Sequence, residues 1–594
     1  MTDASLSLSS FATWRLKAAS FENIRKDLIA GLTVAAISLP QSMAYALVAG
    51  VDPRFGLYTA IVFTAVAGIL GSSRHLVNGP TGAVSLVTFS ALAFIDPEAK
   101  LDSYEAMFLL AVMIGIVQIV IGATRLGDVT RYISESVVTG FIAGAGFLTL
   151  LGQIGGALGV AAKGTGHQSV LTRLYLTLTQ PGHYNYKALT ISLAAIVIAI
   201  LGRRILRALR LPQVEMLVAV LGLSALAYWL GWSEAVPGAK PAIPLIDAVP
   251  AALPSPHVPQ VKAEWLYPLS TSALSIGVLG LLEALAIAKA VAHNSRQQLD
   301  YNRQCLAEGI GNLVGGFFRC MPGAGSLTRT AINYQVGAVS RLSSLVTALA
   351  VAIIVLALGP LAAFIPKAVL AGLLIVASSR LIDIKRIRYT ATASYADLVL
   401  LVGTALSAVF IGVEYAILIG SSASIIWYLL HASRLKTQEL VVAPEKVVRA
   451  RIESDPQASD IAIYDIEGDL FFGSAPELHA FLARAKEDAQ RKQVKALVLR
   501  LKRVRNPDAV ALEVLDLFLR EAHKEGLLVY LAGLRPEIRA ALDRMGVAQR
   551  LGEEFIFPEE EKDYSATLNA IRAALGRIGD RSQVGSHTPN YYLV

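Results

Sequence analysis

The chain has 594 residues, of which 54% are hydrophobic and only 16% are charged, and its mean hydropathy is +0.54. These values are typical of an integral membrane protein and exclude an ordinary soluble chain. The net charge of +8 could suit nucleic acid, but the basic residues gather in short loops between apolar runs. That placement is the one that membrane orientation requires, so we expect a lipid membrane and no nucleic acid as a partner.

The apolar bias is confined to one part of the chain, which divides it into four segments. Residues 1–27 are polar and are expected to form a cytoplasmic N-terminal segment. Residues 28–431 contain many apolar runs of membrane-spanning length and are expected to form a transmembrane domain. Residues 432–579 have an ordinary charged composition, typical of a soluble domain. Residues 580–594 lack periodicity, and a flexible C-terminal tail is predicted there.

Fourteen apolar segments are predicted to span the membrane, and the third and tenth are short. They cover residues 28–48, 55–71, 80–94, 105–124, 132–157, 188–202, 213–232, 268–293, 303–319, 326–337, 342–360, 362–379, 396–413 and 415–431. Basic residues such as Arg203, Arg204 and Arg207 concentrate in the loops after even-numbered spans. The positive-inside rule therefore predicts cytoplasmic N- and C-termini. The membrane is expected to be the cytoplasmic (inner) membrane of a bacterium.

The tenth span begins at a break in which proline and glycine cannot continue a helix. Pro322, Gly323 and Gly325 precede Ser326, which can cap a new helix, and Arg329 follows within its first turn. The N–H groups at a helix N-terminus are unpaired and carry about +0.5 charge. Together with Arg329 they predict an anion site at membrane depth. The alternatives are that Arg329 snorkels to an interface or pairs with a structural carboxylate.

The same break occurs in the first half of the chain, at residues 78–85. Pro80 lies 39 residues after Gln41, just as Pro322 lies 39 residues after Glu283. Two broken helices at corresponding positions of two halves point to the substrate site of a transporter. The residues predicted to bind the anion at these two helix N-termini are Thr81, Gly82, Ala83, Gly325, Ser326, Leu327, Thr328 and Arg329.

Two further spans offer polar side chains to this site. Gln41 and Tyr45 in the first span are four residues apart and therefore share a helix face. The amide of Gln41 can donate to an anion oxygen and Tyr45 can close an apolar wall, although both could simply pack helices together. Glu283 in the eighth span stands alone among apolar neighbours, where it could bind a proton and release it again. Its alternative role is a permanent salt bridge to Arg329.

No enzyme site is evident. HExxH, GxSxG and Walker motifs are missing from the sequence, so we expect no catalytic residues and no ATP-driven pumping. Cys305 and Cys320 form neither a disulfide framework nor a CxxC metal motif. Neither a cofactor nor a metal is predicted.

The tail alternates strands with helices, which predicts a small cytoplasmic α/β domain. The expected strands lie at residues 461–466, 469–472, 494–501, 527–531 and 555–557. The expected helices lie near residues 475–491, 508–524, 535–544 and 563–577.

Taken together, these motifs resemble those of the SulP family of anion transporters, which includes sulfate permeases and the pendrin and prestin relatives. The segments that carry the resemblance are Leu39–Ala46, Phe55–Tyr58, Gly71–His75, Gly79–Pro80, Asn312–Gly315 and Ser326–Thr330. The resemblance covers nearly the whole chain. It implies a seven-plus-seven inverted repeat with core and gate domains, an elevator-like movement between them, and a homodimer.

The resemblance also implies roles for particular residues. It implies an anion held between the third and tenth spans, facing the first and eighth. Glu283 falls where proton-coupled members keep a glutamate. The family positions that bind the anion correspond to Gln41, Tyr45, Ser326, Leu327, Thr328 and Arg329.

The tail resembles a STAS domain, related to bacterial anti-sigma-factor antagonists. Those antagonists carry Asp-Ser-Ser-Gly or a similar motif before the second helix, whereas this chain has Asn506–Ala511 there. The phosphorylatable serine is missing, so a phosphorylation switch at that place is not expected. Support of a dimer or docking of a cytoplasmic protein partner are the remaining roles.

The sequence thus predicts a secondary active anion transporter, with proton-coupled sulfate symport as the leading hypothesis. The alternatives are uptake of bicarbonate or a C4-dicarboxylate, with Na⁺ as coupling ion if Glu283 ligates it. A passive anion channel or exchanger, or a membrane-tethered regulator that acts through the STAS domain, also stays open.

Overall fold

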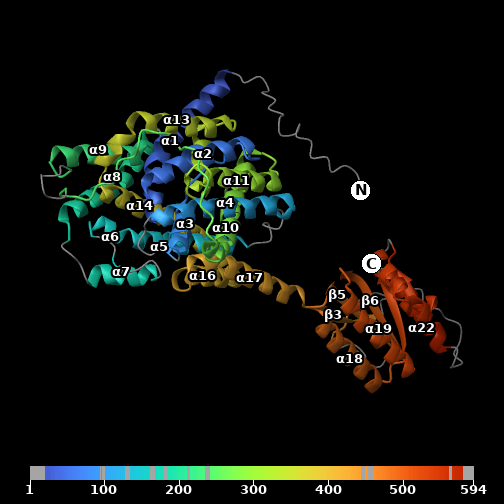
Figure 1. The fold of residues 1–594 in the computed structure, drawn as a ribbon. Coiled ribbons are helices and arrows are strands. Elements are labelled where there is room, and N and C mark those ends of the chain that lie inside the picture. Colours follow the sequence, from blue (N-terminus) through green and yellow to red (C-terminus); the bar gives the residue numbers. More distant parts are fainter. Residues whose placement is uncertain are drawn as a thin grey trace. The chain divides into compact units, whose positions relative to one another are not determined.

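The computed structural model divides after Ser424 into two compact units, a helical bundle and an α/β tail domain (Figure 1). The predicted flexible tail at 580–594, and most of the predicted N-terminal segment, lie outside the described residues, so both stay predictions. The described residues are 21–93, 95, 101–127, 134–160, 163, 168–179, 184–209, 214–233, 241–442, 448–452, 460–560 and 565–579.

Each of the fourteen predicted spans contains a helix. These helices are α1 (Phe21–Val48), α2 (Pro53–Leu70), α3 (Gly82–Ala93), α4 (Leu101–Ala123), α5 (Glu135–Gly152), α8 (Tyr186–Ala208), α9 (Glu215–Trp229), α10 (Ala263–Ser295), α11 (Tyr301–Gly316), α12 (Leu327–Val336), α13 (Leu342–Leu358), α14 (Lys367–Leu381), α16 (Tyr395–Phe410) and α17 (Val413–Ala432). The connecting segments form α6 (Ile154–Ala157), α7 (Val170–Thr179), η3 (Gly359–Phe364) and α15 (Ile384–Ala393). Within the described ranges, eight helical segments are long and apolar enough to cross a membrane.

The bundle is an inverted repeat of two seven-helix halves, and the helix contacts show it. Helix α1 packs against α13 of the second half, and its counterpart α10 packs against α4 of the first. In the same way α2 meets α13 and α11 meets α4, while α5 meets α16 and α14 meets α8. Helices α1–α4 and α10–α13 thus form an interleaved core, and α5, α8, α9, α14, α16 and α17 form the gate.

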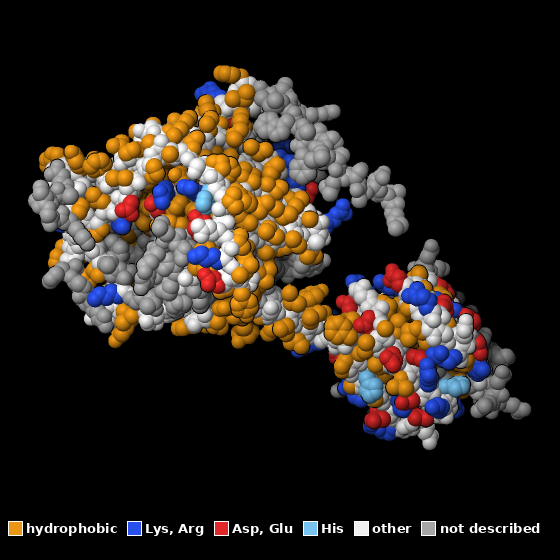
Figure 2. All heavy atoms as spheres, in the orientation of Figure 1, with side chains coloured by type: hydrophobic (Ala, Val, Ile, Leu, Met, Phe, Trp, Pro, Cys, Tyr) orange, Lys and Arg blue, Asp and Glu red, His pale blue; other side chains and the backbone are white. Residues whose placement is uncertain are grey.

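Small residues let these helices approach closely, as is usual in membranes. A Cβ added at Gly56 on α2 would lie 2.0 Å from the carbonyl oxygen of Ser42 on α1. A Cβ at Gly115 on α4 would lie 2.5 Å from the backbone nitrogen of Leu313 on α11. Large apolar side chains lie instead on the outside, where Figure 2 shows them across the visible face of the bundle. That surface suits lipid.

The tail domain is a six-stranded sheet in the order β4-β3-β5-β6-β7-β8, with β5 to β8 parallel and the β3 contacts antiparallel. Its strands are β3 (Lys436–Val442), β4 (Val448–Ala450), β5 (Ile461–Asp469), β6 (Ala496–Arg505), β7 (Leu528–Leu534) and β8 (Ile556–Pro558). Its helices are α18 (Ala475–Arg491), α19 (Ala509–Lys524), α20 (Pro536–Arg544), α21 (Val547–Leu551) and α22 (Ser565–Gly579), with the short η4 (Glu553–Phe555).

Two predictions for this sheet were wrong. The strand expected at 461–466 extends to Asp469 as β5, and residues 470–472 of the second expected strand form no strand. A turn follows, in which the Ser474 hydroxyl donates to the Asp469 carbonyl at 2.7 Å. Strands β3 and β4 were not predicted, because β3 mixes lysine, glutamine and glutamate into a short stretch without a clear alternating pattern.

A buried ion pair joins the two central strands. Asp465 on β5 lies opposite Arg500 on β6, and their side chains are 2.8 Å apart. Arg500 is 1% exposed and Asp465 is 7% exposed. Removing one partner of such a pair leaves the other charge buried and uncompensated.

We expect the substitution Asp465→Ala to lower the free energy of unfolding of the tail domain by about 3–5 kcal/mol. Hydrogen exchange of the β5 and β6 amides in the full-length protein measures this quantity. The control is Asp460→Ala, which removes an exposed pair with Lys495 and should cost less than about 1 kcal/mol. Equal losses in the two variants would contradict the prediction.

Candidate anion-binding site

The two short helices α3 and α12 start from a pair of extended segments in the middle of the bundle. Strand β1 (Asn78–Gly79) and strand β2 (Ala324–Gly325) pair antiparallel, and neither Pro80 nor Pro322 lies in a helix. The two helices therefore leave the strand pair from opposite ends and run in opposite directions. This is the interruption that the sequence predicted in each half.

Both helix N-termini keep unpaired donors. The first intrahelical bonds run from Ser85 N–H to the Thr81 carbonyl at 2.9 Å and from Thr330 N–H to the Ser326 carbonyl at 3.0 Å. The backbone N–H groups of residues 82–84 and 327–329 thus have no acceptor within their own helices. An anion placed there would receive them, and both helix dipoles would favour it.

The predicted capping role of Ser326 was wrong. Ser326 does occupy the position before the first residue of α12, with extended φ −101° and ψ 118°. Its side chain makes no capping hydrogen bond. The hydroxyl therefore does not compete with an anion for the N–H groups of this helix.

Arg329 is buried behind the N-terminus of α3. It is 1% exposed, and its Nη2 donates to the Pro80 carbonyl at 2.9 Å and to the Ser42 hydroxyl at 3.4 Å. Its Nε lies 3.5 Å from Oε1 of Gln41. These partners hold the guanidinium inside the protein, which excludes the snorkelling alternative. Arg329 thus adds a fixed positive charge between the two helix N-termini.

Glu283 on α10 contacts Thr81, the residue just before α3. The Thr81 hydroxyl donates to its Oε2 at 3.1 Å, and the Glu283 side chain is half-buried. Within the described residues no ion pair joins Glu283 to Arg329, which argues against a permanent salt bridge. A Cβ on Gly325 would lie 2.8 Å from the Cα of Ala284, so glycine lets β2 lie directly against α10.

Gln41 and Tyr45 reach the site from α1. Oε1 of Gln41 faces Arg329, while its Nε2 lies 3.7 Å from the sulfur of Met216 on the gate helix α9. Gln41 therefore both packs helices and positions the guanidinium. The Tyr45 ring covers the start of α3, because a Cβ on Gly82 would lie 3.3 Å from its Cε1.

The remaining predicted residues lie at the two helix starts. Ala83 is buried in α3, and Thr328 is half-buried in the first turn of α12. Leu327 is 49% exposed, so its side chain does not help to enclose the site. The structure thus brings all the predicted residues into one region, although Leu327 contributes backbone only.

Sequence reasoning missed several residues that support the site. The Ser42 hydroxyl accepts a hydrogen bond from the Arg329 guanidinium, and the Thr64 hydroxyl donates to the Asn78 carbonyl at 2.7 Å. The Thr330 hydroxyl accepts the Val77 N–H at 3.0 Å. Serine and threonine are common in membrane helices, so nothing local distinguishes these residues. Only the tertiary contacts of Arg329 with α1, and of the chain at β1 with α2 and α12, reveal them.

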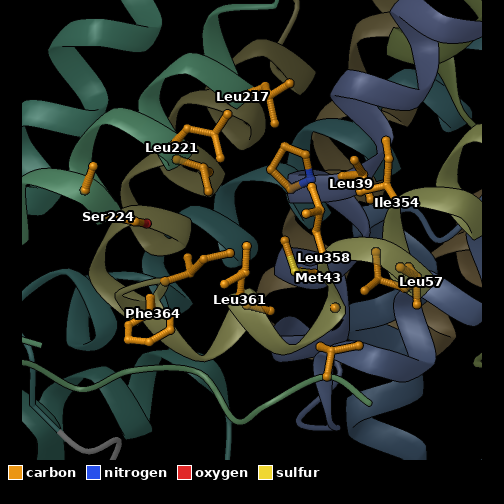
Figure 3. Close-up of a pocket in the computed structure, with 18 of the residues that line it drawn as sticks. Leu39, Met43, Leu57, Leu217, Leu221, Ser224, Ile354, Leu358, Leu361 and Phe364 are labelled. Atoms are coloured by element: carbon orange, nitrogen blue, oxygen red, sulfur yellow. The ribbon is translucent and has the colours of Figure 1, made fainter. Parts of the chain in front are cut away.

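A large cavity of about 530 Å³ lies elsewhere, between α1, α9 and η3 (Figure 3). Figure 3 shows apolar side chains such as Leu39, Met43 and Phe364 around it. Ser224 and Tyr228 provide the only side-chain hydroxyls among its described lining residues. An anion needs several donors to replace water, so this cavity is not the anion site.

The comparisons with known proteins agree with this architecture. The sulfate permease family matches residues 24–404, and the STAS domain matches residues 454–562. A probable sulfate transporter of Mycobacterium tuberculosis is 30% identical over 545 residues, covering 90% of this chain and 93% of that protein. The chloroplastic sulfate transporter 4.1 of Arabidopsis thaliana is 28% identical over 565 residues, covering 93% of this chain and 81% of that protein.

Two solved structures share the fold. The murine Solute Carrier 26 family member A9 anion transporter, in its inward-facing state, matches with a TM-score of 0.86 at 20% identity, covering 97% of this chain and 96% of that chain. The transmembrane domain of a cyanobacterium bicarbonate transporter matches with a TM-score of 0.59 at 24% identity, covering 68% of this chain and 98% of that chain. The chain therefore belongs to the sulfate permease (SulP) family, and it is a membrane anion transporter with a C-terminal STAS domain rather than an enzyme.

Proposed function

We propose that this protein is a secondary active transporter that moves sulfate together with a proton into a bacterial cell across its cytoplasmic membrane. The observation that carries the proposal is the hydrogen bond between Thr81 and Glu283, because it joins a carboxylate to the N-terminus that would hold the anion. Sulfate is favoured by the relatives, which are named sulfate transporters.

The charge at the site supports a divalent anion. Two helix N-termini contribute about +1 in total, and the Arg329 guanidinium contributes another unit. The N–H groups of both helices and the Ser326 hydroxyl provide donors on two sides, and the Thr81 hydroxyl becomes a further donor when a protonated Glu283 donates to it. Sulfate has oxygens in all directions and can accept from both helices at once. We therefore assign anion binding to Gln41, Tyr45, residues 81–83 and residues 325–329.

Glu283 supplies the proton coupling in this proposal. An ionised carboxylate next to the site repels an anion, whereas a protonated one does not and can donate a hydrogen bond. Binding of the anion and binding of the proton at Glu283 then stabilise each other, since such coupling is reciprocal. The Thr81 hydroxyl is the direct link, because it belongs to the residue that precedes α3 and touches the carboxylate.

We further propose that the core moves past the gate like an elevator. The site is built from α1, α3, α10 and α12, which all belong to the core, and it meets the gate through Met216 on α9. A rigid core can carry such a site without dismantling it. In this proposal the termini are cytoplasmic and the protein is a homodimer, with the STAS domain as a support of the dimer or as a docking surface for a cytoplasmic protein.

Uptake of radiolabelled sulfate into proteoliposomes tests the function. An inward proton gradient should drive accumulation above equilibrium, and Na⁺ should have no effect at fixed pH gradient. Competition with bicarbonate and a C4-dicarboxylate reports the selectivity. If sulfate is not taken up and one of these competitors binds strongly, that competitor replaces sulfate as the proposed substrate. If uptake depends on Na⁺, then Na⁺ replaces the proton as the proposed coupling ion. Uncoupled flux would indicate a channel.

For Glu283→Gln we expect proton-driven sulfate uptake to fall to background while sulfate–sulfate exchange persists. The amide keeps the hydrogen-bonding shape of the side chain but cannot carry a proton through the cycle. Glu264→Gln is the matched control, because Glu264 is an exposed residue on the same helix. Full pH dependence in the Glu283 variant would refute the coupling role.

Arg329→Ala should weaken the binding of sulfate more than the binding of a monovalent anion, because the lost unit charge attracts a divalent ion twice as strongly. We expect the apparent affinity to fall by about 100-fold for sulfate and by about tenfold for nitrate. Inhibition constants from competition uptake measure both. Arg329→Lys, which keeps the charge, should show a smaller difference between the two anions. Equal losses would assign Arg329 a structural role only.

Gly79→Ala should raise the KM for sulfate by about tenfold through displacement of the guanidinium. The added Cβ would lie 2.0 Å from Nη1 of Arg329, and Gly79 has φ +154°. Uptake kinetics and thermal unfolding are measured together, so that misfolding is recognised. Gly403→Ala is the control, since a Cβ there meets nothing within 4 Å. Normal kinetics in the Gly79 variant would show that the position of the guanidinium does not matter.

A further inference from the structure

A second cavity, of about 540 Å³, lies at the boundary between core and gate. Its core side is formed by the end of α1 and by α3, and its gate side by α5, α6, α7 and α14. Unlike the apolar cavity of Figure 3, it presents two cations, Arg173 on α7 and Lys367 at the start of α14. The described residues that line it include no aspartate and no glutamate.

Arg173 has no acidic partner among the described residues. Its Nε is fully buried without a hydrogen-bond acceptor, and its guanidinium carbon lies 4.6 Å from the centroid of the Phe89 ring on α3. Burial lowers the pKa of the Arg173 guanidinium below its usual value. The ring holds the cation in place, but a buried donor without an acceptor is costly. An anion in the cavity would supply the missing partner.

Lys367 is exposed, but it lies at an unfavourable end of its helix. It is the first residue of α14, where the positive end of the helix dipole disfavours a cation. Its own N–H is occupied by the Pro244 carbonyl at 2.9 Å, so the chain entering the helix is fixed there. A lysine at this end is stabilised if an anion lies between it and Arg173. The two cations come from different elements, α7 and α14, and line one cavity.

The cavity begins close to the candidate anion-binding site. Leu86 on α3 lines it, and Leu86 is one helical turn, about 5 Å, beyond Gly82 and Ala83. Leu47 and Val48, which follow Tyr45 on α1, line it as well. The cavity therefore lies next to the N-terminus of α3, along the boundary that an anion would follow past the gate.

We propose that this cavity is a second anion-binding subsite, in which Arg173 and Lys367 hold an inorganic oxyanion on its way to or from the site at α3 and α12. The assignment of the occupant as the transported ion rests on the proposed function. The positive potential of a low-dielectric cleft concentrates anions and raises their rate of entry. Arg173 and Lys367 are then residues that set the apparent affinity without forming the central site.

A cysteine reporter tests the charge of the cavity without any transport. Gln153 lines the cavity, and the native Cys305 and Cys320 are buried, so Gln153→Cys gives one reactive thiol. Its reaction rates with a negatively charged and a positively charged methanethiosulfonate are compared in the full-length protein. We expect the anionic reagent to be favoured, and Arg173→Gln with Lys367→Gln to lower the rate ratio by about tenfold or more.

Added sulfate should slow the anionic reagent in the reporter protein and should fail to do so once both cations are removed. Lys187→Gln is the matched control, because Lys187 lies over the Trp232 ring outside the cavity. It should leave the rate ratio unchanged. A ratio that is insensitive to Arg173 and Lys367, or no protection by sulfate, would overturn the subsite.

Transport by the same variants separates the subsite from the proposed function. If both hold, Arg173→Gln with Lys367→Gln raises the KM for sulfate uptake about tenfold while kcat is kept. If the wild-type protein transports no sulfate but the rate ratio still falls in the double variant, the subsite holds and the proposed function fails. If transport is normal in the double variant and the rate ratio does not change, the subsite fails and the proposed function stands.

Discussion

Backbone groups that have no partner at membrane depth are the constraint on which this structure depends. Two helices that begin inside the bundle expose N–H donors at their starts and carbonyl acceptors in the extended chain before them. The structure satisfies the two kinds of group differently. The Arg329 guanidinium donates a hydrogen bond to the Pro80 carbonyl, and β1 pairs with β2. The first N–H groups of α3 and α12 have no acceptor within their own helices, and an anion is the partner that we propose for them.

The inverted repeat makes the two halves alike in backbone and unlike in charge. Each half breaks a helix after a proline, and each break feeds a short helix. The first half places the neutral Gln41 where the second half places Glu283, and α3 contains no charged residue, whereas α12 carries Arg329. A symmetric scaffold thus produces an asymmetric site, with a cation bonded to Pro80 and a carboxylate bonded to Thr81 at the start of α3. That asymmetry is the basis of the proton coupling that we propose.

The sequence predicted the helices and their interruptions because these are local. Apolar runs, Pro80 and Pro322 need no tertiary information, and the offset between the halves placed Gln41, Glu283 and Arg329 together. The orientation of the guanidinium could not be predicted, since its acceptors Pro80 and Ser42 lie far away in the chain. Ser326 and strand β5 were misjudged for a related reason: local propensity favoured a cap and a second strand, and tertiary pairing decided otherwise.

The two cavities that α1 helps to line differ in chemistry, and under the proposed function that difference favours one of them as the path of an anion. The cavity beside α9 offers the Ser224 and Tyr228 hydroxyls within an otherwise apolar wall, so an ion entering it would lose its hydration without replacement. The cavity beside α7 and α14 has no carboxylate among its described lining residues and offers Arg173 and Lys367. Both lie against the same core helix, so the difference comes from the gate. If the anion passes through the second cavity as proposed, desolvation cost rather than available space selects its route, because the two cavities have similar volumes.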